Sequence, residues 1–269
     1  MSQVASWVPE GLDVTRPSAA RMYDYLLGGG HNFEADRQLA ARVSGAHPGC
    51  WDIARLNRAF LRRAVLELNR AGVRQFLDLG SGIPTVGNVH EIAQRVDPEA
   101  RVVYVDHDPV AVAHCELILE DNDRADVVLA DLRDPDSILT SPITRRILDF
   151  DQPVGLLMVC VVHFIPPEED PVRLLSRFRE ALAPGSYLAL SHLTGDSGAT
   201  EMKALVEVMR HSKDPIHPRT RSEITELFTG FELVPPGVVS VADWRPSSPG
   251  DAGDLPERDQ VLAGVGIKR

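Results

Sequence analysis

The sequence predicts an α/β protein in which a helical N-terminal region precedes a doubly wound, mainly parallel sheet. Three observations lead to this prediction. From residue 72 onward, short apolar runs alternate with segments of helical periodicity, which is the pattern of parallel strands joined by crossover helices. The run at residues 154–162 is almost continuously apolar, as expected for a strand covered on both faces. Residues 18–71, in contrast, show mainly helical spacing.

The N-terminal region is expected to form an irregular arm followed by three helices. The first helix begins near Ser18, a favourable cap, and ends at the glycines 28–30. The other two helices are expected at residues 33–43 and 51–71. We therefore divide the chain into an N-terminal arm with a helical cap, residues 1–71, and an α/β domain, residues 72–269.

The α/β domain is expected to alternate strands with helices up to its end. Strands are predicted at residues 75–79, 101–105, 125–130, 154–162, 186–192, 231–234 and 260–267. Helices are predicted at residues 86–96, 109–120, 136–147, 171–182, 198–211 and 221–227. A loop rich in Pro, Gly, Ser and Asp, residues 246–254, precedes the last strand.

Composition excludes several classes of protein. The net charge of −11 makes a general nucleic-acid binder improbable, because a phosphate backbone is bound mainly by Lys and Arg. The one dense basic cluster, Arg55, Arg58, Arg62 and Arg63, is consistent either with a local patch or with the ion-paired face of a helix. The three scattered cysteines indicate no disulfide framework, and the histidines show no metal-ligand spacing, so no metal is predicted.

The chain shows no sign of a membrane or secretory segment. The first 30 residues contain no apolar stretch after a basic start. The longest apolar run, residues 154–165, is too short to span a bilayer. We expect a cytoplasmic enzyme that does not bind membranes.

The strongest local signal is the glycine-containing turn after the first strand. Asp78 is followed by Leu79 and by Gly80-Ser81-Gly82 before a predicted helix. The two glycines allow a tight turn and a close approach to a ligand. A dinucleotide site needs a third glycine, whereas this chain has Thr85 at that position. Asp78 is suited to accept hydrogen bonds from a cationic amino group, although a strand–turn–helix junction without a ligand is the structural alternative.

The next two strands also end in acidic residues. Asp106 follows Gly82 by 24 positions, where a carboxylate can accept the hydroxyls of a ribose. His107 is placed to flank an adenine, and Asp108 is suited to cap the helix that begins at Pro109. After the third strand, Asp131 and Leu132 are candidates for the adenine edge. A turn-forming role is the alternative for Asp131.

This order of residues resembles the class I S-adenosylmethionine-dependent methyltransferases. The resemblance rests on Asp78-x-Gly80-x-Gly82, the acidic second strand end, Ala130-Asp131, and residues 161–166 and 182–186. More narrowly, residues 16–33, 57–63 and 75–90 resemble the actinobacterial family called S-adenosyl methyltransferase, a former domain of unknown function, and this likeness covers the whole chain. One departure is Pro84, where many methyltransferases have a third glycine.

The resemblance implies a Rossmann-like, seven-stranded sheet with a reversed last hairpin, and S-adenosylmethionine as the cofactor. We expect methyl transfer to an unidentified small molecule. Asp78 and the Gly80-Ser81-Gly82 backbone would hold the methionine end, and Asp106 would hold the ribose. The alternatives are a non-catalytic S-adenosylmethionine-binding regulatory module and an NAD-dependent oxidoreductase. The sequence does not indicate the oligomeric state.

Three further residues are candidates for the reaction itself. His163 lies at the end of the fourth strand, where open α/β sheets place their chemistry, and is suited to act as a base or to pack as a hydrogen-bonded core residue. Tyr23, in a polar and aromatic segment beside the glycines 28–30, is suited to orient the acceptor or to form the outer face of its helix. Arg58 is a candidate to pair with the cofactor's carboxylate.

Overall fold

The computed structural model describes residues 12–84, 87–210, 212–247 and 256–269. Its centre is one sheet with the strand order β3-β2-β1-β4-β5-β8-β6, and β7 pairs with β8 beside this path. β1 to β5 are parallel, whereas β8 runs antiparallel to β5 and to β6. The strands are β1 Gln75–Leu79, β2 Arg101–Asp106, β3 Ala125–Leu129, β4 Gly155–Val159, β5 Tyr187–Leu193, β6 Glu232–Leu233, β7 Val239–Ser240 and β8 Val261–Ile267.

The predicted fold class is confirmed. All seven predicted strands are present, with a reversed strand near the end of the chain. The additional strand β7 has only two residues, which is too short for a recognisable apolar pattern. The predicted arm falls largely outside the described residues, as do residues 248–255 of the predicted loop, the first residue of the helix predicted at 86–96 and His211.

The predicted helices are present with small differences at their ends, and one helical segment and one strand differ more. The segment 136–147 forms two helices, because Ser141 is extended before Pro142. The predicted strand 154–162 ends at Val159, because Cys160 has a φ of +53° and turns the chain. The helices are α1 Ala19–Leu26, α2 Glu34–Ala46, α3 Cys50–Arg70, α4 Val89–Val96, α5 Pro109–Leu119, α6 Pro135–Thr140, α7 Pro142–Ile147, α8 Pro171–Ala181, α9 Ala199–Met209 and α10 Arg221–Glu226, with short 3₁₀ turns η1 Val162–Phe164, η2 Pro167–Glu169 and η3 Pro256–Gln260.

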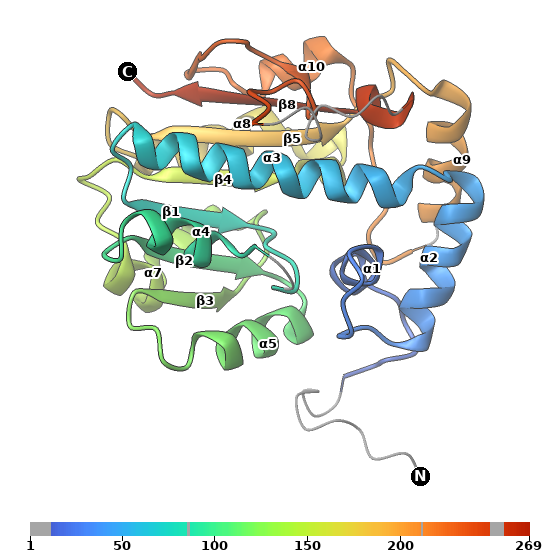
Figure 1. The fold of residues 1–269 in the computed structure, drawn as a ribbon, viewed down its shortest axis with the longest axis horizontal. Coiled ribbons are helices and arrows are strands. Elements are labelled where there is room, and N and C mark those ends of the chain that lie inside the picture. The colour runs from blue at the N-terminus through green and yellow to red at the C-terminus, as the bar shows by residue number, and fades with distance from the viewer. Residues whose placement is uncertain (1–11, 85–86, 211, 248–255) are drawn as a thin grey trace.

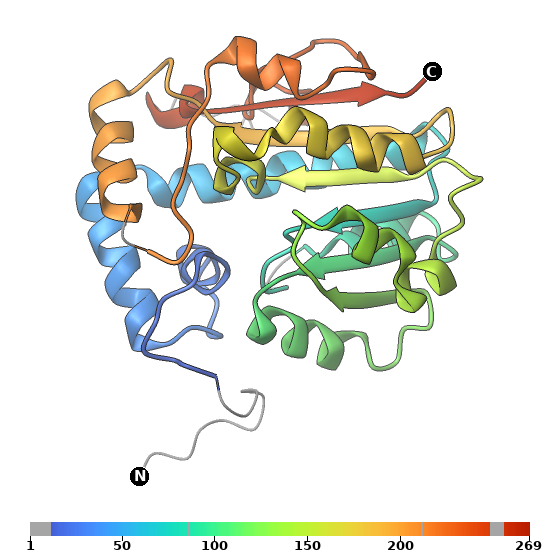
Figure 2. The same cartoon turned by 180° about the vertical axis from the view of Figure 1, so that it is seen from behind.

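The sheet is covered on both faces, as its apolar strands require. Side chains alternate along each strand: Phe76 belongs to the core cluster that includes α3 and α4, whereas Leu77 and Leu79 belong to the opposite cluster. Figure 1 shows α3 and α4 in front of the sheet, and Figure 2 shows α8 on the other face. The core is therefore two apolar layers with the sheet between them.

A group of helices lies beside the carboxyl ends of the parallel strands (Figure 1). α1 contacts α2, α3 and α5, and α2 contacts α9. We call α1, α2, the first turns of α3, and α9 the helical cap. The sequence predicted that residues 1–71 contribute to this helical cap. It assigned α9, which follows β5, only to the α/β domain. No helix of the described residues is long and apolar enough to cross a membrane.

Candidate active site

The glycine turn after β1 folds across the end of β2. The amides of Gly80 and Ser81 both donate to the carbonyl of Val105, at 2.8 and 3.1 Å. Gly80 has a φ of +68°, and a Cβ atom there would lie 2.2 Å from a methyl group of Val161. Gly82 also has a positive φ, but space is open around its Cα. The turn thus needs glycine at both positions, for conformation at Gly82 and for conformation and space at Gly80.

Backbone donors fix the carboxylate of Asp106 at the edge of the main cavity. One oxygen accepts from the amide of Gly82 at 2.8 Å, and the other accepts from the amide of Asp108 at 2.9 Å. Asp106 is buried, and this burial raises its pKa despite the two hydrogen bonds. Each oxygen retains a lone pair, so the side chain is an oriented acceptor at the strand end.

Asp108 and Arg21 have structural roles. The carboxylate of Asp108 accepts from the amide of Val110 and caps α5. Arg21 donates to Asp108 at 3.2 Å and to Asp36 at 2.9 Å, and all three side chains are buried. This ion triad joins α1, α2 and α5. Arg21 therefore attaches the cap to the sheet domain.

Asp78 and Arg58 form a pair of opposite charges at the cavity. Both side chains line the main cavity and a small neighbouring cavity under the glycine turn. Desolvation raises the pKa of Asp78 to about 7, and the nearby charge of Arg58 partly opposes the shift. Among the described residues, neither side chain has a hydrogen-bond partner, and Nε of Arg58 is buried. A cation and a carboxylate with free polar atoms suit a zwitterionic group such as the amino acid end of S-adenosylmethionine.

His107 and Asp131 are placed differently. His107 lines the cavity, and its Nε2 lies 3.5 Å from a carboxylate oxygen of Asp214, which raises its pKa. The carboxylate of Asp131 is instead held by Arg133, and neither Asp131 nor Leu132 lines the cavity in the part of the chain that the structure describes. The structure therefore brings His107 to the site but does not bring Asp131 and Leu132 there.

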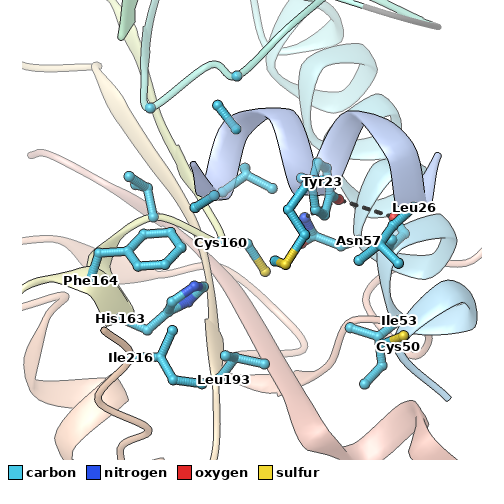
Figure 3. A pocket seen from close by; sticks show the side chains of 18 of the residues that line it. Tyr23, Leu26, Cys50, Ile53, Asn57, Cys160, His163, Phe164, Leu193 and Ile216 are labelled. Atoms are coloured by element: carbon cyan, nitrogen blue, oxygen red, sulfur yellow. Dashed lines mark hydrogen bonds between the residues drawn. The ribbon is translucent and has the colours of Figure 1, made fainter. Parts of the chain in front are cut away.

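The cavity itself lies between the strand ends and the helical cap. It measures about 170 Å³, which is room for on the order of ten water molecules. The strand ends and α3, which carries Arg58, contribute its charged residues. The rest of the cap contributes mostly apolar side chains, including Leu26 and Ile53 (Figure 3). A small molecule fits these dimensions, whereas a folded macromolecule does not.

His163 projects into this cavity from η1, beside Phe164 and Ile216 (Figure 3). It is buried, and no described residue hydrogen-bonds to either ring nitrogen. Burial, with contributions from His192 and the cation of Arg219, holds its pKa well below the usual 6.5. His163 is therefore a neutral imidazole at physiological pH.

Arg219 fixes the segment that carries His163. Its guanidinium donates to the carbonyls of Val162 at 3.1 Å and Ile165 at 2.7 Å, on either side of His163. It also donates to Nε2 of His192 at 2.8 Å. The sequence analysis missed Arg219, because a buried arginine far along the chain carries no local signal of its contacts.

The hydroxyl group of Tyr23 is already engaged. It donates to the carbonyl of Ala54 at 3.1 Å and accepts from the amide of Asn57 at 3.0 Å (Figure 3). Burial raises the pKa of Tyr23 to about 12. Asn57 was not predicted as a site residue, although its spacing from Ile53 and Phe60 places it on the apolar face of α3 and could have revealed it.

Potential metal ligands do not cluster in the described part of the chain. Among the residues that the structure describes, no three His, Cys, Asp or Glu side chains gather closely enough to hold a metal ion.

The dense basic cluster on α3 is divided: Arg55 pairs with Asp52, Arg63 donates to backbone carbonyls, and Arg58 lines the cavity. Because Arg63 is buried and Arg58 faces the cavity, the four arginines do not form one exposed patch.

The fold and the site together define a Rossmann-like, S-adenosylmethionine-dependent methyltransferase. A sequence profile of the S-adenosyl methyltransferase family matches residues 5–269, and the chain belongs to that family. S-adenosylmethionine is accordingly its cofactor. The free polar atoms of Asp78 and Arg58, together with the oriented Asp106, fit this group.

Two solved structures share nearly the whole chain. A Thermobifida fusca protein, provisionally described as a methyltransferase, is 43% identical with a TM-score of 0.92, over 98% of this chain and 100% of its own. A DUF574 family protein from Streptomyces avermitilis is 39% identical, also with a TM-score of 0.92, over 96% and 99% of the two chains. They support both the fold and the family.

More distant relatives give less information about this chain. A curated carboxy-S-adenosyl-L-methionine synthase from Ectopseudomonas mendocina is 32% identical over 133 residues, which is 49% of this chain and 50% of that protein. A Burkholderia thailandensis didemethyltoxoflavin N1-methyltransferase, solved with S-adenosylhomocysteine, is 18% identical over 97% of this chain and 93% of its own, with a TM-score of 0.50. The latter likeness shows the fold alone.

Proposed function

We propose that this enzyme transfers the methyl group of S-adenosylmethionine to a small-molecule acceptor bound beneath the helical cap. The observation that carries the proposal is the division of one cavity: the charged residues and the glycine turn lie at the strand ends and at Arg58 of α3, and apolar residues lie on the cap. Such a cavity accommodates a charged cofactor at one end and a less polar molecule at the other.

The cofactor end is assigned from the available polar atoms. Arg58 would pair with the carboxylate of the methionine end and Asp78 with its amino group. The Gly80-Ser81-Gly82 backbone would pass close to the ligand, and Asp106 would accept from the ribose. His107 would flank the adenine. The adenine-edge role of Asp131 and Leu132 stays a prediction, and it requires the pair between Asp131 and Arg133 to open.

The protein's contribution to the reaction is mainly positioning. When bound, S-adenosylmethionine supplies a methyl group already activated on a sulfonium. The apolar cap excludes water from the cavity, and the neutral His163 can accept a proton or a hydrogen bond from the acceptor. Tyr23 is less suited to that role, because its hydroxyl is bonded to Ala54 and Asn57.

Two measurements test this function. The first is equilibrium binding of radiolabelled S-adenosylmethionine in parallel with NAD. The second is incubation with a metabolite extract and S-adenosylmethionine, followed by a mass search for the gain of one methyl group. We expect S-adenosylmethionine to bind, NAD not to bind, and one methylated product to form.

Each alternative gives a different result. Binding without any methylated product would favour the regulatory module, and tight NAD binding would favour the oxidoreductase. A product that is the cofactor itself with an added carboxyl group would instead indicate the chemistry named for the Ectopseudomonas mendocina relative.

A further inference from the structure

The part of the cavity under the cap carries no charged side chain among the described residues that line it. We call this part the acceptor chamber, and its apolar walls include Met22, Leu26, Ile53, Leu205, Met209 and Ile216. The charged residues of the whole cavity, Arg58, Asp78 and Asp106, all belong to the cofactor end, where His107 also lies. An ionised acceptor would enter the chamber without a counter-charge, which carries a large desolvation cost.

The polar groups of the chamber are almost all engaged. Tyr23 is bonded to Ala54 and Asn57, and the remaining amide oxygen of Asn57 accepts from Ser191 at 2.6 Å. Among the described lining residues, Nδ1 of His47 and Nδ1 of His163 are both buried without a partner. Nε2 of His47 is bonded to Gln260, whereas no described residue bonds to either ring nitrogen of His163, so His163 has the larger unpartnered polar capacity. An unpaired buried polar atom is costly, so a ligand group that hydrogen-bonds to it is favoured.

The surroundings of His163 also select the type of partner. Its segment is held by the guanidinium of Arg219, which donates to the carbonyls of Val162 and Ile165. A fixed cation behind the imidazole disfavours an ammonium group in front of it. A neutral hydroxyl group has no such penalty. The walls favour an aromatic frame, because Met22, Met209 and the ring of Phe164 offer thioether and aromatic contacts.

We propose that the methyl acceptor is a neutral aromatic hydroxyl compound whose hydroxyl group hydrogen-bonds to His163 while its ring lies against the apolar walls of the acceptor chamber. This inference rests on the proposed function, because it assumes that the cofactor occupies the charged end. It makes His163 a specificity-determining residue.

The test compares two probes that share one ring system. The full-length protein is first saturated with S-adenosylhomocysteine, so that Arg58 is occupied, and calorimetry then measures the binding of 2-naphthol and 2-naphthoic acid. We expect 2-naphthol to bind at least about tenfold more tightly than the carboxylate. Equal affinities, a preference for the carboxylate, or no binding of 2-naphthol below about 1 mM would overturn the proposal.

Variants at two positions, His163 and Ile53, locate the binding. His163→Leu should weaken 2-naphthol binding about tenfold and His163→Gln should restore part of it, while 2-methylnaphthalene, which lacks the hydroxyl, is unaffected by either change. Ile53→Lys should place a cation in the chamber and reverse the preference in favour of 2-naphthoic acid. Its matched control is Ile118→Lys on α5, whose side chain is exposed and does not line the cavity.

The same preparations separate this inference from the proposed function. If S-adenosylhomocysteine does not bind to the unaltered protein, the proposed function fails at its first step. If it binds but the probes show no preference, only the acceptor class is wrong. Retained S-adenosylhomocysteine affinity in each variant shows that the variant is folded. If His163→Gln loses the preference for 2-naphthol as completely as His163→Leu does, the hydrogen bond to His163 does not have the proposed role.

Discussion

The side-chain amide of Asn57 donates a hydrogen bond to the hydroxyl oxygen of Tyr23 at 3.0 Å, and this contact joins α3 to α1. The hydroxyl proton of Tyr23 is directed to the carbonyl of Ala54, so the group has no proton left for an acceptor. The burial that raises its pKa to about 12 also keeps it protonated. Tyr23 is therefore better explained as a residue that holds the cap than as a base.

Tyr23→Phe tests this explanation. We expect the free energy of unfolding to fall by about 1 kcal/mol, the net value of one lost hydrogen bond, and the methyl-transfer rate to stay within about threefold. Urea denaturation and single-turnover transfer measure the two quantities. A rate loss of two orders of magnitude with unchanged stability would instead place the hydroxyl in the reaction.

Asp106 gives the sharpest test of the cofactor end. Asp106→Ala removes an acceptor that two backbone amides orient, so we expect S-adenosylmethionine affinity to fall at least about tenfold. Binding of the radiolabelled cofactor measures the change, and circular dichroism reports the fold. The exposed Asp136, which pairs with Arg177, offers the matched control Asp136→Ala. Unchanged affinity in Asp106→Ala would refute the ribose assignment.

The two glycines of the turn should differ in their tolerance of alanine. At Gly82 the space is open, so Gly82→Ala adds only the cost of a positive φ, about 1–2 kcal/mol. At Gly80 the new Cβ would collide with Val161 as well, and we expect a loss of more than about 4 kcal/mol. Chemical denaturation of both variants measures this difference, and equal losses would show that the turn rearranges.

The fold, and the position of the glycine turn and Asp106 at one cavity, could be predicted from the sequence because both rest on local patterns. Buried parallel strands require continuous apolar runs, and the Gly80-Ser81-Gly82 turn and Asp106 follow directly from strand ends. The acceptor side depends on contacts between distant residues. Asn57 meets Ser191 across 134 positions, and Arg219 reaches Val162 across 57. No periodicity encodes such pairs, which is why Arg219 was missed; the helical spacing of Asn57 indicates its face of α3 but not its partners.

Arg219 is predicted to position His163 through the backbone. Lysine cannot reproduce the two-nitrogen geometry that bonds the carbonyls of Val162 and Ile165, so Arg219→Lys should reduce stability by about 1–3 kcal/mol. The turnover number should fall while S-adenosylmethionine affinity is kept, because the cofactor end is untouched. Steady-state kinetics and calorimetry separate the two effects. The control is Arg210→Lys, an exposed arginine of the same chain region.

His107 and Asp214 predict a pH-dependent part of the stability. Asp214 also accepts from the amide of Ala19, so the pair joins the end of β2 to the start of α1. The hydrogen bond to Asp214 raises the pKa of His107, and the same contact lowers the pKa of Asp214 although burial opposes it. A raised histidine pKa stabilises the fold fully below about pH 6.5 and loses that effect as the pH rises through the folded-state value.

The lowered pKa of Asp214 makes its contribution present above about pH 3.8 and lost only as the pH falls through the lower folded-state value. The pair is therefore strongest between those limits. Because His107 is 43% exposed, its contribution is expected to stay below about 1 kcal/mol. Urea denaturation should show that His107→Gln destabilises the protein more near pH 6 than near pH 8.5. In an Asp214→Asn background the same change should have a smaller pH-dependent effect, because only Asp106, whose carboxylate lies 3.9 Å from Nδ1 of His107, remains to raise the pKa. A penalty for His107→Gln that grows as the pH rises would show that the charged pair does not connect α1 to β2.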